Sequence, residues 1–268
     1  MSWFKKIFNK EKNMTTIEEP KEEETLCIEE PGVVSFYPEP PMTMELEPVE
    51  DTATSIPPLD LMKVSFKGSP NKSSRASGEP THIVLHHTGP GSFNGIVNWL
   101  CNKEAKASAH YVVGTGAQIK QLVNTMKKAW HAGRAKWDGK TDVNDFSIGI
   151  EICNIGILEK GEDGNFYYEV GRNLKKYTGG VEPQQGTITY PSGTVQMGYF
   201  VPYPEKQIDK VVSLCKALVE KYPQITRDNI VTHYQVGQPE GRKNDPFGLD
   251  VEKIKDMIFG KRKIKLRI

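Results

Sequence analysis

The stretch that decides the fold is Thr81-His82-Ile83-Val84-Leu85-His86-His87-Thr88. A continuous run of apolar and largely β-branched residues is typical of a strand that is covered on both faces of a sheet. The run is followed by Gly89-Pro90-Gly91, which predicts a turn. We therefore expect the ordered domain to begin with a buried strand that ends in two adjacent histidines.

The sequence downstream of this strand predicts an alternation of helices and strands. A helix is expected around residues 96–100 and a long amphipathic helix over 205–222, which Pro223 terminates. Strands are expected at 110–113, 119–123 and 146–152. The pattern predicts an α/β fold. Residues 158–203, rich in Gly and Tyr, are expected to form a hairpin excursion or a long loop beside the site.

Composition places bounds on the class of protein. The chain has 268 residues, of which 37% are hydrophobic and 26% charged, so it can hold one large domain or two small ones. The formal net charge is +1, which gives no argument for binding nucleic acid. The four cysteines are far apart and form no CxxC pair, so neither a disulfide framework nor a Cys-rich zinc knuckle is expected.

Both ends of the chain differ from its middle. Residues 13–78 are rich in Glu, Pro, Ser and Thr, a composition that buries too little apolar surface to offset chain entropy. We expect residues 1–78 to form a disordered or extended leader, with short strands such as 33–37 docking on the domain. The domain itself is expected at 79–260. A basic tail at 261–268 is expected to be a solvated charge run, or to lie on anionic wall polymers or membrane.

The first ten residues carry two alternatives. Trp3, Phe4, Ile7 and Phe8 share one face at helical spacing beside lysines, which is typical of a short interfacial helix on an anionic membrane; the alternative is a solvated segment. These residues lack the apolar region and cleavage site of a secretory signal, so synthesis in the cytoplasm is expected. The chain has no apolar run long enough to span a bilayer.

All six histidines lie in the expected domain, and they are the first candidates for chemistry. Successive side chains of a strand point to opposite faces, so only one of His86 and His87 is expected to bind a metal. One of these two histidines, together with His233 and Asp245, would form a set of two imidazoles and a carboxylate that suits zinc and leaves a coordination position for water. Taken singly, each histidine is better explained as a hydrogen-bonded core or surface residue. The set predicts a hydrolase.

Glu151 is a further candidate because it follows a run of apolar strand residues. An ionisable side chain at such a position is costly unless it is paired or functional. The alternative interpretation is a salt bridge at a strand end.

Several motifs together resemble the zinc-dependent N-acetylmuramoyl-L-alanine amidases of the type 2 family. That family includes amidase-type phage lysozymes, cytosolic muropeptide amidases and peptidoglycan recognition proteins. The resemblance covers about residues 79–255. It rests on Ile83-Val84-Leu85-His86-His87-Thr88, Ser108-Ala109-His110-Tyr111-Val112-Val113, Ala129-Trp130-His131-Ala132-Gly133, Ser147-Ile148-Gly149-Ile150-Glu151, Thr232-His233 and Lys243-Asn244-Asp245-Pro246.

The resemblance implies a central mixed β-sheet flanked by helices, with a zinc site at one end of the sheet. It implies Zn²⁺ ligation by His86, His233 and Asp245, with His87 facing away. It also implies a general base at Glu151, an oxyanion-stabilising cation at Lys243, and substrate contacts by His131 and Asn154. Ala109 departs from relatives that have a tyrosine there, so a tyrosine role at that position is unavailable.

The expected function is hydrolysis of the amide bond between N-acetylmuramic acid and L-alanine in peptidoglycan or muropeptides. Two settings remain open, a phage or prophage endolysin that reaches the wall after release, and an enzyme of muropeptide turnover in the cytoplasm. Two other functions are kept as alternatives: a non-catalytic peptidoglycan-binding module, and a zinc amidase or peptidase with another amide substrate. The oligomeric state is left open by the sequence.

Overall fold

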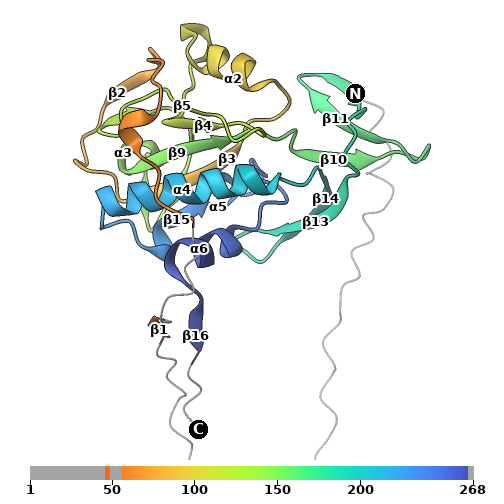
Figure 1. Ribbon diagram of the computed structural model, residues 1–268. Helices are drawn as coiled ribbons and strands as arrows, with labels where there is room; N and C mark the ends of the chain where they lie inside the picture. The colour runs from red at the N-terminus through yellow and green to blue at the C-terminus, as the bar shows by residue number, and fades with distance from the viewer. Residues whose placement is uncertain (1–45, 49–55, 265–268) are drawn as a thin grey trace, which may run out of the picture. The chain divides into compact units, whose positions relative to one another are not determined.

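The central element of the domain is a five-stranded mixed sheet with strand order β15-β3-β9-β4-β5. The computed structural model describes residues 46–48 and 56–264 (Figure 1). The first four strands run parallel to their neighbours, and β5 is antiparallel to β4. The mixed α/β architecture expected from the sequence is confirmed. The strands are β3 (His82–His87), β4 (Tyr111–Val113), β5 (Ile119–Gln121), β9 (Ser147–Ile152) and β15 (Ile230–Thr232).

Both faces of this sheet are covered, as the apolar run at 83–85 predicts. On one face, Ile83 and Leu85 pack with the apolar stripes of α4 (Glu205–Lys221), which crosses in front of the sheet in Figure 1, and of α6 (Val251–Phe259). On the opposite face, Val84 packs with Val143 and Phe146 around α3 (Val143–Phe146). This second face is the one towards which alternation along β3 directs the side chain of His86.

The predicted excursion after β9 is a second five-stranded sheet, entirely antiparallel, with order β12-β11-β10-β14-β13. Figure 1 shows it beside the end of the central sheet. A small apolar cluster that includes Ile188, Tyr190 and Phe247 joins it to the segment between α5 and α6. Its strands are β10 (Ile157–Lys160), β11 (Phe166–Val170), β12 (Asn173–Lys176), β13 (Gln184–Thr189) and β14 (Val195–Phe200).

The remaining elements are short. The helix α2 (Phe93–Leu100) begins at Ser92, whose hydroxyl accepts a hydrogen bond from the Gly95 amide. The others are α5 (His233–Val236), the 3₁₀ turns η1 (Leu61–Lys63), η2 (Lys103–Ala105) and η3 (Arg227–Asn229), and the strands β1 (Leu46–Pro48), β2 (Lys72–Ser74), β6 (Lys127–Ala129), β7 (Lys136–Trp137), β8 (Lys140–Thr141) and β16 (Arg262–Ile264).

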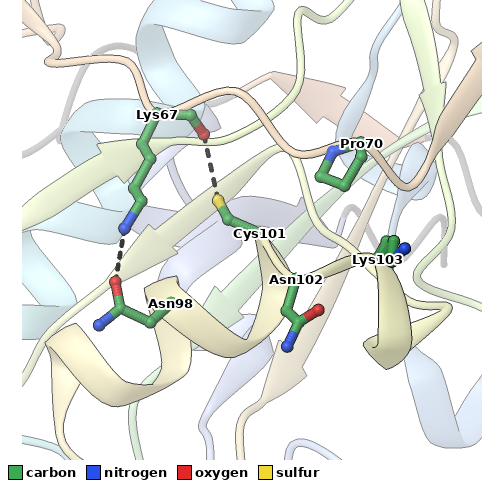
Figure 2. Close-up of a pocket in the computed structure, with 6 residues that line it drawn as sticks. All are labelled: Lys67, Pro70, Asn98, Cys101, Asn102 and Lys103. Atoms are coloured by element: carbon green, nitrogen blue, oxygen red, sulfur yellow. Dashed lines mark hydrogen bonds between the residues drawn. The ribbon is translucent and has the colours of Figure 1, made fainter.

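Residues 56–78 differ from the expected leader, because they pack on the domain. Val64 belongs to the main hydrophobic core, and β2 pairs with β6. Figure 2 shows the contact with α2, where the Lys67 ammonium donates to Asn98 (2.5 Å) and the Lys67 carbonyl accepts from the Cys101 thiol (3.2 Å). The segment is polar in composition, and several of its polar side chains, among them Ser69 and Asn71, hydrogen-bond to carbonyls of the domain. The domain boundary expected at residue 79 is therefore wrong, and the domain includes residues 56–78.

Arg75 is the most heavily bonded residue of this segment. Its guanidinium donates to five main-chain carbonyls, those of Thr125, Lys127, Asn144, Asp145 and Ser147, at 2.5–3.3 Å. The carboxylate of Asp145 binds the same segment, because it accepts hydrogen bonds from the amides of Ala76 and Ser77, both at 2.8 Å. Arg75 thus joins the segment to α3, to the start of β9 and to the start of β6.

The expected basic tail also takes part in structure. Residues 262–264 form β16, which pairs antiparallel with β1, and the Arg262 guanidinium forms an ion pair with Asp228. The tail is therefore not a free charge run at these positions. The expected helix at 1–10 and the short strand at 33–37 lie outside the described residues. Within residues 46–48 and 56–264, no helix is both long and apolar enough to cross a membrane.

We predict that Arg75→Lys lowers the free energy of unfolding by about 2–4 kcal/mol, because an ammonium has three donors and leaves buried carbonyls unpaired. Denaturant unfolding measures the change. The exposed Lys103→Ala variant, which loses only a 3.9 Å ion pair to Glu104, serves as control and should unfold as the parent does. Equal stability of all three forms would contradict the anchoring role.

Candidate metal centre and active site

Three side chains from separate segments meet at the carboxyl end of the central sheet. His86 is next to last in β3, and His233 follows β15 directly. Because β15 and β3 are parallel and pair Thr232 with Leu85, the next residues on the two strands are neighbours in space. Asp245 comes from the loop between α5 and α6, and its carbonyl accepts a hydrogen bond from the Tyr234 amide at 2.9 Å.

The donor atoms of this cluster converge closely. The Nδ1 atoms of His86 and His233 lie 3.0 Å apart, and Asp245 Oδ2 lies 3.2 Å from the first and 2.9 Å from the second. All three residues are buried, and their donor atoms all lie within 4.8 Å of one another, close enough to share a metal ion. Four tetrahedral ligands at zinc bond lengths stand about 3.3 Å apart, close to the spacing seen here.

The hydrogen bonds around His233 show what the cluster requires. Its Nε2 lies 3.0 Å from the carbonyl of Ala132, which can only accept, so the ring proton is on Nε2. The Nδ1 lone pair then faces the carboxylate oxygen of Asp245. Two acceptors in contact repel each other unless a cation or a proton lies between them, so this donor set fits a divalent metal ion.

Burial controls the protonation of these groups. It lowers the pKa of His86 to about 4; the neighbouring His233 adds to the lowering, and Asp245 opposes it. Burial alone would raise the pKa of Asp245, but its contacts with His233 and His86 hold that pKa well below the usual value. A neutral imidazole and an ionised carboxylate are the forms that bind metal ions.

Glu151 lies directly across from His86 on the adjacent parallel strand β9. Burial, followed by the negative charge of Asp245, raises the pKa of Glu151 well above its usual value, and Lys243 opposes the shift. Its Oε2 atom is enclosed and has no hydrogen-bond partner among the residues that the structure describes. A salt bridge at a strand end, the alternative considered for Glu151, is not found in this part of the chain.

Lys243 reaches the same region from the loop that carries Asp245. Its positive charge lowers the pKa of both His86 and His87. Gly237 makes room for it, since a Cβ there would lie 3.2 Å from Lys243 Cβ and Cγ and 3.0 Å from the His233 carbonyl oxygen. The structure thus brings together five of the predicted site residues, namely His86, His233, Asp245, Glu151 and Lys243.

His87 takes the opposite face of the strand, as alternation predicts. Its Nδ1 accepts a hydrogen bond from the Phe247 amide at 3.1 Å, and Gly156 leaves room for its ring. His87 therefore supports the loop after Asp245 instead of joining the cluster.

Two predicted substrate-binding residues have other partners in the structure. Both ring nitrogens of His131 face protein groups, Nδ1 towards His86 Nε2 (3.0 Å) and Nε2 towards the Ser147 hydroxyl (3.3 Å). The amide of Asn154 donates to the Val201 carbonyl (2.9 Å) and accepts from the Gly156 amide (3.0 Å). Both side chains thus have protein partners, and the substrate contacts expected of them stay a prediction.

The sequence interpretation missed the groups that hold His131. Asn144 Oδ1 accepts from the amides of His131 (3.1 Å) and Ala132 (2.8 Å), and nothing in its local sequence indicates this role. Gly149 carried a usable signal, because an isolated glycine in an apolar strand often marks a close approach. A Cβ at Gly149 would lie 2.4 Å from His131 Cγ.

A hollow of about 350 Å³ is lined by residues that adjoin the cluster in sequence, although none of the five clustered residues lines it. One wall is formed by His87 and Asn244, which adjoin the cluster residues in sequence, and another by Tyr167, Tyr168 and Leu174 of the second sheet. The second sheet therefore provides an aromatic wall of this hollow.

Comparison with known proteins identifies the family to which this chain belongs. The family model described as N-acetylmuramoyl-L-alanine amidase matches residues 76–248, and the chain belongs to that family. The resemblance stated from the motifs is confirmed. The match begins before residue 79, in agreement with the packing of the preceding segment.

Individual relatives agree with this assignment. N-acetylmuramoyl-L-alanine amidase AmiD of Escherichia coli (strain K12) is 29% identical over 171 residues, which are 61% of this chain and 48% of AmiD. 1,6-Anhydro-N-acetylmuramyl-L-alanine amidase AmpD of Enterobacter cloacae is 28% identical over 196 residues, 66% of this chain and 80% of AmpD. The chain thus spans about half the length of AmiD. A crystal structure of a selenomethionine AmpD derivative shares the fold, with a TM-score of 0.51 at 22% identity, covering 74% of this chain and 96% of that one.

We predict that Gly149→Ala destabilises the domain by about 1–3 kcal/mol, because the added methyl group overpacks the His131 ring. Thermal or denaturant unfolding of the metal-free protein measures it. Gly180→Ala is the matched control, since a Cβ at Gly180 meets nothing within 4 Å. If the two variants were equally stable, the close packing of His131 on Gly149 would be refuted.

Proposed function

We propose that this chain hydrolyses the amide bond between the lactyl group of N-acetylmuramic acid and L-alanine, using a zinc ion held by His86, His233 and Asp245. Family membership supports the substrate class. The observation that carries the metal is the contact of His233 Nδ1 with Asp245 Oδ2 at 2.9 Å, in which both atoms are acceptors.

The donor set favours zinc over other divalent ions. Two imidazole nitrogens and one carboxylate oxygen are common ligands of catalytic zinc, whereas Mg²⁺ and Ca²⁺ prefer oxygen ligands alone. When bound at a site with three protein ligands, zinc supplies Lewis acidity to the scissile carbonyl and acidifies the attacking water.

Glu151 is proposed as the group that moves the proton. The attacking water adds its oxygen to the carbonyl carbon and gives a proton to the Glu151 carboxylate. When the carbon–nitrogen bond breaks, the same proton passes to the departing amine of L-alanine. A pKa raised by burial suits a carboxyl group that must first accept and then return a proton.

Lys243 is proposed to stabilise the negative charge that develops on the carbonyl oxygen during the attack. The proposal is supported by its effect on the pKa of both Glu151 and His86, which the Lys243 charge lowers. The aromatic wall of the hollow, with Tyr167 and Tyr168, offers a surface for the glycopeptide beside the cleaved bond.

The biological setting remains a separate proposal. The name of the AmpD relative specifies a 1,6-anhydro-N-acetylmuramyl substrate, and by similarity we propose that soluble muropeptides are substrates of this chain. Polymeric peptidoglycan is the substrate expected for an endolysin. Parallel digestion of purified sacculi and of anhydro-muropeptides, followed by mass spectrometry, distinguishes the two by which reaction releases free L-alanine amino termini.

We predict one zinc ion per chain, measured by elemental analysis of the purified protein. His233→Ala should lose the metal, because it removes a ligand. His87→Asn should retain it, since that side chain lies on the other face and accepts only from the Phe247 amide. Full zinc content in His233→Ala would rule out this ligand set.

We predict that Glu151→Gln keeps its zinc but lowers kcat by roughly 10²-fold or more, because an amide cannot take the proton from water. Turnover is followed by the appearance of L-alanine amino termini from a muropeptide. Near-normal kcat in a zinc-loaded variant would assign the proton transfer to another group.

A further inference from the structure

The second ring nitrogen of His86, Nε2, points away from the His86–His233–Asp245 cluster and contacts His131. His86 Nε2 lies 3.0 Å from His131 Nδ1, and both rings are buried. One of these two nitrogens must carry the shared proton. If His86 Nε2 carries it, then a neutral His86 presents a lone pair at Nδ1 to its neighbours in the cluster.

The direction of the hydrogen bond between His86 and His131 follows from a series of hydrogen bonds that ends at the Val143 carbonyl. The Ser147 hydroxyl donates to the Val143 carbonyl at 2.6 Å, and a carbonyl can only accept. Ser147 Oγ is then left as an acceptor for His131 Nε2 at 3.3 Å. A neutral His131 has a single N–H, so its Nδ1 must accept from His86 Nε2.

We infer that His131 is a positioning residue for metal binding, which sets the tautomer of His86 so that Nδ1 is free to bind the ion. The inference rests on the zinc site proposed above. It replaces the substrate-binding role that the family resemblance implies for His131 with a role behind the metal ligand.

The dipeptide His131-Ala132 also orients His233, the second imidazole of the cluster. The Ala132 carbonyl accepts from His233 Nε2, while the His131 ring accepts from His86 Nε2. Asn144 holds both peptide amides through a single side-chain oxygen. Residues 131–132 therefore form a template that turns the Nδ1 atoms of both rings towards Asp245.

The test compares His131→Leu with His131→Asn in zinc affinity, measured by competition with a chelator. Leucine fills the space without an acceptor, whereas the Oδ1 of asparagine can occupy the position of the lost Nδ1. Loss of an outer hydrogen-bond partner of a metal ligand lowers metal affinity by about 10- to 100-fold. We expect that loss in His131→Leu and substantial recovery in His131→Asn.

The matched control is His82→Leu. His82 is a buried histidine of β3, the strand that carries His86, and it contacts Thr81 and Asn229 at the other end of that strand. Zinc affinity should be unchanged in this variant. Unfolding of each metal-free variant verifies that the fold is retained.

The outcomes separate this inference from the zinc site itself. The role of His131 would be overturned if His131→Leu bound zinc as tightly as the parent, or if the Leu and Asn variants lost affinity equally. In either case, loss of zinc from His86→Ala would still support the zinc site. If His86→Ala also kept its zinc, the site would fail. Imidazole ¹⁵N chemical shifts of the zinc-loaded parent provide a readout without mutation: protonation of His131 at Nε2 is expected, and protonation at Nδ1 would refute the proposal.

Discussion

Parallel pairing of β15, β3 and β9 is the constraint on which the site depends. The register places Thr232 beside Leu85 and His86 beside Glu151, so residues far apart in sequence become neighbours at one end of the sheet. Side-chain alternation then assigns His86 to the cluster and His87 to the opposite face. A shift of one residue in either pairing would exchange these faces and separate the proposed proton carrier from the proposed ligands.

Burial of several imidazoles in one region imposes a second constraint. His86, His110, His131 and His233 are all enclosed, and each has a lowered pKa or main-chain partners that fix its proton. His110, for example, accepts from the Gly149 amide at 2.9 Å and lies 2.9 Å from the Lys127 carbonyl, so its role is to support β9. Because each ring is neutral and its proton is held on a particular nitrogen, these histidines can differ in function although they are close in space.

Sequence patterns predicted the parts of the structure that depend on local periodicity. The apolar run at 83–85, the strand ending at Ile152 and the stripe of α4 were visible as patterns, and so was the convergence of two histidines and an aspartate through their motifs. Residues 56–78 could not be assigned this way, because Arg75 is held by carbonyls 50 or more positions away. The orientation of His131 likewise depends on Ser147 and Gly149, which lie in another strand.

The pairing of β1 with β16 has a consequence for how the domain is attached to anything else. Leu46 is the register partner of Ile264, so the polypeptide that precedes one strand and the polypeptide that follows the other leave from a common point. A fusion partner or a surface tether at either end would hold the domain by this same point. Joining the two strands by a short linker and opening the chain at the turn around Gly164 would give a circular permutant whose ligand-bearing strands keep their neighbours.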